Sequence, residues 1–355
     1  MAYWTWLVPL AGVSILGAAI ASGTSTLIAT LAALGLVGSV FAAVHHAEVV
    51  AHRVGEPFGT LVLAVAVTVI EASLILSMVI AGGASQAAVP RDTIYAALMI
   101  ICNGVVGVCL LVGGWHHREQ SFRVEGANSG LAALIPMAAL TLVLPTFTTT
   151  TPSGTYSESQ LIFAAVASLA LWAVFVFVQT MRHRDYFLPV VNTSDPDAHA
   201  APPTDAMAWG SFGLLLVALV AVVGLAKVLS PAIERGVAAA GAPKAVIGIA
   251  IALIVLLPET WAAVRAARAN RLQTSMNLAI GSALASIGLT IPVVAIAAVI
   301  MDIPLVLGLE AKDIAMLVLT FLVSTVTLAT GRTHLMQGAV HLVIFAAFLF
   351  LALVP

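Results

Sequence analysis

Long apolar runs separated by short polar segments fill almost the whole chain. A membrane-spanning helix needs roughly 20 mostly apolar residues, and the pattern predicts eleven spans. They cover residues 5–22, 26–50, 57–82, 93–114, 126–148, 159–181, 209–229, 243–267, 275–301, 305–329 and 337–354. The sequence therefore predicts an all-α, polytopic membrane protein.

Composition supports a chain that folds in a lipid bilayer. Of the 355 residues, 61% are hydrophobic and only 8% are charged, whereas soluble domains carry about 25% charged residues. The net charge of −2 argues against a nucleic-acid partner. Cys102 and Cys109 form no zinc motif and are expected to pack inside a span. The first apolar run lacks a basic leader, so we expect a retained helix and no cleaved signal peptide.

One long polar segment, 182–208, divides the chain in two. It is rich in Pro, Asp and Ala and lacks apolar periodicity, which is typical of a linker. The expected organisation is an N-terminal helix (1–25), a first repeat (26–181), the linker (182–208) and a second repeat (209–355). Because each repeat holds five spans, an odd number, the second repeat enters the membrane inverted, as in many secondary transporters.

Basic residues are distributed unevenly between the two sides of the predicted membrane. Nine lie on the side of the N-terminus: Arg53, Arg118, Arg123, Arg182, Arg184, Arg265, Arg268, Arg271 and Arg332. Five lie on the other side: Arg91, Lys227, Arg235, Lys244 and Lys312. Basic loops favour the cytoplasm. We therefore predict a cytoplasmic N-terminus and linker and an external C-terminus, in a bacterial inner membrane.

Two glutamates lie alone in the middle of apolar runs. Glu71 falls in the second span of the first repeat and Glu259 in the second span of the second repeat. A carboxylate at the centre of a membrane helix costs about 2.5–3.5 kcal/mol on insertion scales and usually marks an ion or proton pathway. The matched positions predict that both glutamates bind cations and protons near the membrane midplane.

Further oxygen ligands are expected around the two carboxylates, since Ca²⁺ prefers carboxylates, carbonyls and hydroxyls. Pro258 has no N–H, so it leaves the carbonyl of Ile254 without its helical partner, and Pro292 does the same one span later. Such helix breaks are tolerated where they line a cavity. The supporting positions are Thr68, Asn103, Ile254, Ser282 and Ser286, with Thr290 as a further hydroxyl.

A buried carboxylate pair also has proton chemistry. Desolvation and a neighbouring carboxylate both favour the protonated form of a carboxyl group. A cation and a proton then compete for the same oxygens. Competition at one site that opens alternately to each side produces antiport.

Other polar residues have plainer interpretations. Membrane Ser and Thr residues usually serve packing, and a single membrane glutamate can be a contact between helices. His45, His46, Glu48 and His52 lie near a span end, where snorkelling to the interface is the default and a pH-sensing patch is the alternative.

The two glutamate stretches resemble the calcium/cation antiporter superfamily, and within it the cation/proton exchanger branch. The second stretch, LLPETWAAVRAARANRLQTSMNLAIGSALASIGLTIPV (256–293), is similar to that family's second motif, and GEPFGTLVLAVAVTVIEASLI (55–75) is similar to its first. The resemblance covers nearly the whole chain and is closest to bacterial calcium/sodium/potassium–proton antiporters. It implies Glu71 and Glu259 as the cation and proton carriers and Ser282 as a supporting ligand.

The chain departs from the family pattern at several positions. Thr68, Val69 and Ile70 stand where the family has Gly-Asn-Ala before the first glutamate, and Leu256, Leu257 and Pro258 stand before the second. Thr260 replaces a common His, and Ala285 replaces a common Gln. These changes remove amide oxygens, which leaves Na⁺ and K⁺ open beside Ca²⁺.

The sequence thus predicts a secondary antiporter that exports a cation, with Ca²⁺ favoured over Na⁺ or K⁺, in exchange for protons and without a resident cofactor. A sodium-coupled calcium exchanger and a monovalent cation/proton antiporter are the alternatives within transport. A membrane-embedded enzyme lacks a His-Glu-x-x-His or Gly-x-Ser-x-Gly motif, and a structural membrane protein does not require two midplane carboxylates. The expected partners are inorganic cations, protons and the lipid bilayer, with a homo-oligomer open.

Overall fold

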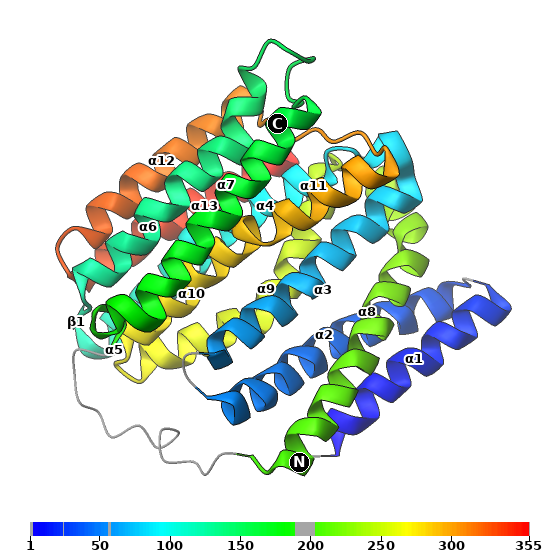
Figure 1. Cartoon of the computed structure of the whole chain (residues 1–355), viewed down its shortest axis with the longest axis horizontal. Coiled ribbons are helices and arrows are strands. Elements are labelled where there is room, and N and C mark those ends of the chain that lie inside the picture. The colour runs from blue at the N-terminus through cyan, green and yellow to red at the C-terminus, as the bar shows by residue number, and fades with distance from the viewer. Residues whose placement is uncertain (1–2, 24, 56–57, 189–202, 355) are drawn as a thin grey trace.

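The computed structural model describes residues 3–23, 25–55, 58–188 and 203–354, and helices account for most of them. The helices are α1 (Trp4–Ser22), α2 (Thr26–Val54), α3 (Phe58–Gly82), α4 (Val89–Met99), α5 (Val106–His117), α6 (Val124–Ala138), α7 (Glu158–Phe177), α8 (Asp205–Ala239), α9 (Ala245–Arg268), α10 (Leu272–Gly288), α11 (Thr290–Met301), α12 (Ala311–Leu328) and α13 (Leu335–Leu353). Two short strands, β1 (Glu119–Ser121) and β2 (Arg332–His334), form an antiparallel ribbon. Figure 1 shows the helices as one bundle with the two ends of the chain on opposite sides.

The predicted membrane architecture is confirmed. Eleven helical segments are long and apolar enough to cross a bilayer, and they coincide with the predicted spans. The largest difference is α8, which runs from Asp205 to Ala239 through Pro231, whereas the apolar pattern predicted a span over 209–229. The helix extends beyond the apolar run at both ends. A span is predicted from apolar residues alone, but the i to i−4 backbone hydrogen bonds of a helix form equally between polar residues outside the membrane. Of the predicted linker, residues 189–202 lie outside the described residues.

Contacts between loops sort into two faces, as alternating spans require. On the N face, which carries the start of α1, Arg53 Nε donates to Asp205 Oδ1 at 2.7 Å and joins the end of α2 to the start of α8. The ribbon β1–β2 lies on the same face, and Gln120 Nε2 in β1 donates to the carbonyl of Ala267 at 2.9 Å.

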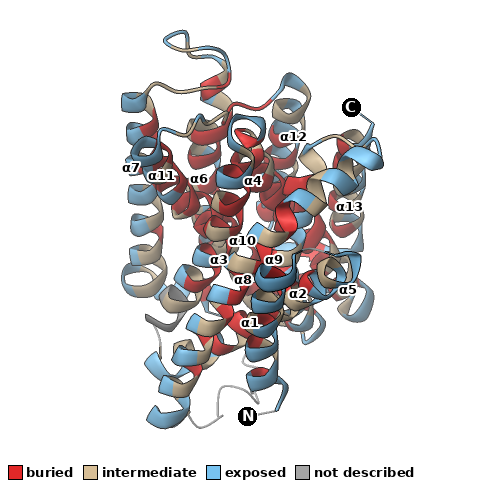
Figure 2. Ribbon diagram, turned by 90° about the vertical axis from the view of Figure 1, so that its right-hand side faces the viewer, coloured by how far each residue is buried: buried red, intermediate tan, exposed pale blue. Residues whose placement is uncertain are grey.

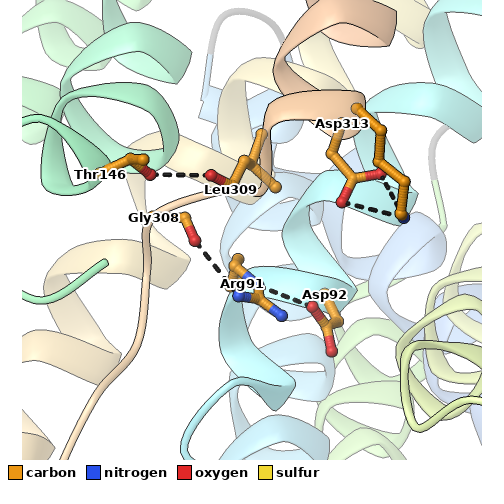
Figure 3. A network of polar contacts seen from close by, with 7 residues as sticks. Arg91, Asp92, Thr146, Gly308, Leu309 and Asp313 are labelled. Atoms are coloured by element: carbon orange, nitrogen blue, oxygen red, sulfur yellow. Dashed lines mark hydrogen bonds and ion pairs between the residues drawn. The ribbon is translucent and has the colours of Figure 1, made fainter. Parts of the chain in front are cut away.

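The opposite face, called the C face because α13 ends there, has its own network. Arg91 donates to Asp92 Oδ1 at 2.8 Å and to the carbonyl of Gly308 at 3.2 Å. Thr146 Oγ1 donates to the carbonyl of Leu309 at 2.8 Å. Figure 3 shows how these bonds tie α4 and the end of the α6 span to the loop that precedes α12. Each face is therefore held together by residues far apart in sequence.

The two halves run in opposite directions. The end of α2 meets the start of α8 through Arg53 and Asp205, so the first helices of the two predicted repeats are antiparallel. The third span is irregular in each half: a π-helical segment, Ile100–Val105, joins α4 to α5, and a break at Leu289 separates α10 from α11. The fold is one N-terminal helix plus two inverted five-helix units. The exact boundaries of the repeats stay a prediction.

The structure corrects one of the two expected helix breaks. The chain breaks three residues before Pro292, as expected, but α9 continues as one α-helix through Pro258. A proline removes a single backbone donor and usually kinks or breaks a helix. Here neighbouring turns and packed helices keep the segment helical, as membrane helices commonly allow.

Burial places the centre of the bundle at the α4–α5 span. In its most apolar window 83% of the residues are buried, compared with 22% for α1, and Figure 2 shows buried residues concentrated in the middle of the bundle and exposed ones on its outer helices. Glycines allow the closest approaches. A Cβ atom at Gly338 in α13 would collide with the backbone of Leu111 in α5, which is the small-residue contact typical of membrane helices.

We expect Gly338→Val to destabilise the protein, because the added side chain forces α13 away from α5. Overpacking costs about 1–3 kcal/mol, which should lower the melting temperature in detergent and the yield of monodisperse protein. Gly213→Val is the matched control, since a Cβ atom there meets open space on α8. Equal melting temperatures for both variants would contradict the close contact.

Candidate cation site

Glu71 and Glu259 line one cavity of about 110 Å³. Its walls come from α3, α7, α9 and α10, and the π-helical end of the α7 span (Val178–Arg182) contributes Gln179. The lining residues are Leu63, Ala64, Val67, Thr68, Glu71, Trp172, Phe175, Val176, Gln179, Glu259, Asn277, Leu278, Gly281, Ser282, Ala285 and Ser286. The fold thus brings the two predicted carboxylates to a common space.

Glu71 is buried and accepts hydrogen bonds from two hydroxyl groups, one of which is shared between its two carboxylate oxygens. Ser286 Oγ lies 2.8 Å from Oε2 and 3.0 Å from Oε1, and Thr290 Oγ1 lies 3.0 Å from Oε2. The donors come from α10 and from the first residue of α11, on either side of the break at Leu289. These contacts fix the position of a carboxylate that would otherwise be costly inside a membrane.

Glu259 accepts a hydrogen bond from Ser282 Oγ. Its neighbour Thr260 points elsewhere, because Thr260 Oγ1 donates to the carbonyl of Leu256 one turn back at 2.7 Å. The residue that replaces the family's common His is therefore engaged with its own helix. Glu259 is less buried than Glu71.

The three hydroxyls form a ladder. Ser282, Ser286 and Thr290 follow one another at intervals of four residues, which corresponds to about 6 Å per step along a helix. Glu259 uses the first step and Glu71 the next two. The two carboxyl groups therefore lie at successive depths along the interrupted α10–α11 span, and their charges are close enough to interact.

The cavity extends from the glutamates toward the N face. Leu63 lies in the first turns of α3, Gln179 near the end of the α7 span and Asn277 in the second turn of α10, and all three segment ends belong to that face. Thr290, on the C-face side of Glu71, is fully buried. The site in this structure therefore opens toward the N face.

The cavity wall carries no basic residue among the residues described for it. Its polar groups are carboxylates, hydroxyls and the amides of Gln179 and Asn277. In the described part of the chain, no group of three or more His, Cys, Asp and Glu residues is placed to hold a metal ion. Oxygen donors without thiolate or imidazole suit hard cations such as Ca²⁺, Na⁺ and K⁺.

Thr68 and Ser286 lie where the sequence predicted supporting ligands. Thr68 lines the cavity one turn before Glu71, and its buried hydroxyl has no hydrogen-bond partner among the described residues. Ser286 and Ser282 hold the two carboxylates. A bound cation could use the Thr68 hydroxyl without breaking an existing bond.

Asn103 and Ile254 are not brought to this cavity. Asn103 Nδ2 donates to Thr320 Oγ1 at 2.9 Å, and its Oδ1 shares a hydrogen bond of 3.2 Å with His341 Nδ1. His341 also bonds Thr327, so the amide belongs to a buried network between the π-helical segment, α12 and α13. The Ile254 side chain lines a separate apolar cavity with Leu36 and Leu74, because α9 presents a different face at that turn.

Two polar lining residues were missed in the sequence. Asn277 Nδ2 donates to the carbonyl of Phe187 at 2.7 Å, and its Oδ1 accepts from Gln273 Nε2 at 2.9 Å. Gln179 is a lone amide near the end of an apolar run. Asn277 lies four residues before Gly281, which lines the same cavity, and this i, i+4 spacing on one helix face was the available signal.

Comparisons with known proteins agree with this fold. The family model described as sodium/calcium exchanger protein matches residues 24–181 and 210–354. The protein y4hA of Sinorhizobium fredii, named only as an ionic transporter, is 47% identical over 355 residues, covering 99% of this chain and 96% of its own. The sodium-potassium/proton antiporter ChaA of Escherichia coli is 36% identical over 322 residues, covering 90% and 87%.

A solved structure matches the whole chain as well. Native YfkE, a Ca²⁺/H⁺ antiporter protein, superposes with a TM-score of 0.75 at 16% identity, covering 99% of this chain and 100% of that one. The fold is therefore shared despite low identity. The chain belongs to the sodium/calcium exchanger protein family, in its cation/proton exchanger branch.

Proposed function

We propose that this protein is a secondary antiporter that exports a cation in exchange for protons at a site formed by Glu71 and Glu259. The chain is a membrane transporter and not an enzyme, as its family membership indicates. The observation that carries the proposal is the shared cavity, which holds two carboxylates and no described basic residue. Cations and protons are then the available counter-charges.

The need to neutralise the two carboxylates would couple cation movement to proton movement. Two buried carboxylates without a counter-ion are strongly unfavourable, since an unpaired buried charge costs several kcal/mol. Either a cation or protons can neutralise them, and the hydroxyl donors stay bonded in both cases. A cation and protons therefore exclude one another at the pair, and each turn of the cycle exchanges one for the other.

Alternating access requires the same pair to face each side in turn. The cavity opens toward the N face, and the C face is tied by the network around Arg91 and Gly308. If the N face is cytoplasmic, this structure is the state that loads the cation to be exported. Rearrangement of the inverted units around the site would expose it to the other side.

The charge of the site and the number of its oxygen ligands support one cation over the others. Two carboxylates match the charge of Ca²⁺, and hydroxyls add the oxygens it prefers, so Ca²⁺ is the favoured ion. Na⁺ and K⁺ are the alternative, supported by the likeness to ChaA. A sodium-coupled calcium exchanger is the second alternative. Flux into proteoliposomes under a pH gradient, measured for each ion with and without external Na⁺, separates the three.

We expect Glu71→Gln and Glu259→Gln each to reduce exchange by about 100-fold or more, because a carboxylate about 4 Å from a bound cation contributes about 4 kcal/mol of attraction at an effective dielectric constant of about 20. The amide keeps the side-chain volume, so melting temperature and yield should change little. Glu125→Gln is the control, because this glutamate is exposed at the start of α6. Near wild-type flux in both site variants would refute a shared site.

Apparent cation affinity should weaken as the pH falls. Protons bind the carboxylates at low pH and exclude the cation, so affinity is highest on the alkaline side. The two groups interact, and only apparent values for the pair are measurable. Equilibrium binding of Ca²⁺ to purified protein between about pH 6 and 9 measures this slope directly, and affinity that does not depend on pH would argue for the sodium-coupled alternative.

The proposed orientation places the N-terminus and the linker in the cytoplasm and the C-terminus outside. Cys102 and Cys109 are buried, so single added cysteines can report sidedness. Asp195→Cys in the linker should react with an impermeant maleimide only after permeabilisation. Ser153→Cys, exposed between α6 and α7, should react in intact cells. The reverse pattern would show that the protein is inserted the other way round.

A further inference from the structure

A second cavity of about 380 Å³ lies beside the cation cavity, between α1, α2, α9 and the start of α10. Its lining residues are Trp4, Phe41, Val44, His45, Glu48, Pro258, Trp261, Ala262, Arg265, Ala266, Arg271, Thr274 and Leu278. The ends of α2 and α9 place it at the N face. Neither candidate ligand of the cation site lines it.

The two cavities are separated by a thin layer of protein. Leu278 lines both. Pro258 lines the second cavity, and the next residue, Glu259, lines the first. Glu48 is near enough for its charge to act on Glu259. A proton on Glu259 therefore has a second titratable carboxyl group close by, on the far side of Leu278.

Glu48 is well placed to exchange protons with solution. Its side chain is exposed, and half-buried His45 lies one turn before it on α2, with its ring 5.4 Å from that of Trp4. The charged groups facing it from the packed elements are Arg265 on α9 and Arg271 before α10, both of which have interaction partners.

Two further histidines lie near Glu48 on α2, and neither lines the second cavity. His46 points toward α1, where its Nε2 lies 2.8 Å from the carbonyl of Thr5. His52 is exposed one turn beyond Glu48. Glu48 and His45 are thus the described proton-exchanging groups that line the second cavity.

The electrostatics of the two cavities differ. The cation cavity presents oxygen donors and no described basic residue, whereas the second cavity presents two arginines, one histidine and one glutamate. Fixed guanidinium groups raise a barrier to metal cations, and one carboxylate supplies too few ligands for a hard cation. A proton can still move between carboxyl, imidazole and water.

We propose that Glu48 passes protons between the N-face solution and Glu259, through a route separate from the cation cavity. During export, the incoming cation displaces the proton from Glu259. The O–H bond of the Glu259 carboxyl group breaks and an O–H bond forms on the Glu48 carboxylate, through water that enters when the Leu278 side chain moves. Glu48 then releases the proton to solution, aided by His45. This inference rests on the proposed antiport function.

Glu48→Gln tests the route, because two transport modes respond differently. Cation/proton exchange needs proton transfer, whereas isotopic self-exchange of the cation at equal pH does not. Since a positioned acid–base group contributes about 10²–10⁴-fold, cation/proton exchange in proteoliposomes should fall at least about tenfold. Self-exchange should stay within about twofold of wild type.

Glu48→Asp should restore most of the proton-coupled rate, and Glu125→Gln on the same face should behave as wild type. Melting temperatures establish that each variant is folded. Wild-type cation/proton exchange in Glu48→Gln would overturn the proton route, and so would an equal loss of both modes, which indicates a structural role. Failure of the wild-type protein to respond to a pH gradient would instead overturn the antiport function itself.

Discussion

The arrangement of this protein depends on holding two carboxyl groups inside a membrane bundle without a basic partner in the described cavity. Ser282, Ser286 and Thr290 provide the hydroxyls that hold them, all from one interrupted span. Hydroxyl donors stabilise a carboxylate without cancelling its charge, unlike an arginine or lysine. The site therefore keeps its demand for a mobile positive charge, which is what exchange of a cation for protons needs.

The third span of each half has an irregular backbone, and α10 packs against the π-helical segment Ile100–Val105 of the matching span. The break at Leu289 lies next to Thr290, so the donors to Glu71 come from two separate helical segments. The matching span of the first half has a π-helical segment, and its Asn103 bonds Thr320 and His341. The polar residues of the two spans therefore have different contacts. Those of the α10–α11 span bond the two glutamates, and Asn103 of the α4–α5 span bonds α12 and α13. The two third spans therefore share an irregular backbone but differ in their polar contacts.

The two cavities at the N face are lined by groups of different charge. Oxygen donors line the space around Glu71 and Glu259, and basic groups line the space around Glu48. The separating layer is narrow, since Leu278 borders both. Separate paths for a cation and a proton would let the two ions compete at one site without meeting in one channel. On the same face, the ribbon β1–β2 joins the loop before α6 to the loop before α13, and the pair Arg53–Asp205 joins the end of α2 to the start of α8.

The sequence by itself determined the membrane class and the eleven spans, and it singled out the two glutamates that line one cavity. Apolar runs of sufficient length must be helices in lipid, and lone carboxylates within them are too costly to be incidental. The sequence also singled out Ser282, Ser286 and Thr290 as hydroxyl positions on one span. The tertiary structure decided which faces meet. It directed Asn103 and the Ile254 side chain away from the cavity, kept α9 continuous through Pro258, and added Asn277 and Gln179 to the wall. Periodicity fixes the direction of a side chain around its own helix, but the partner across the interface depends on how eleven helices pack together.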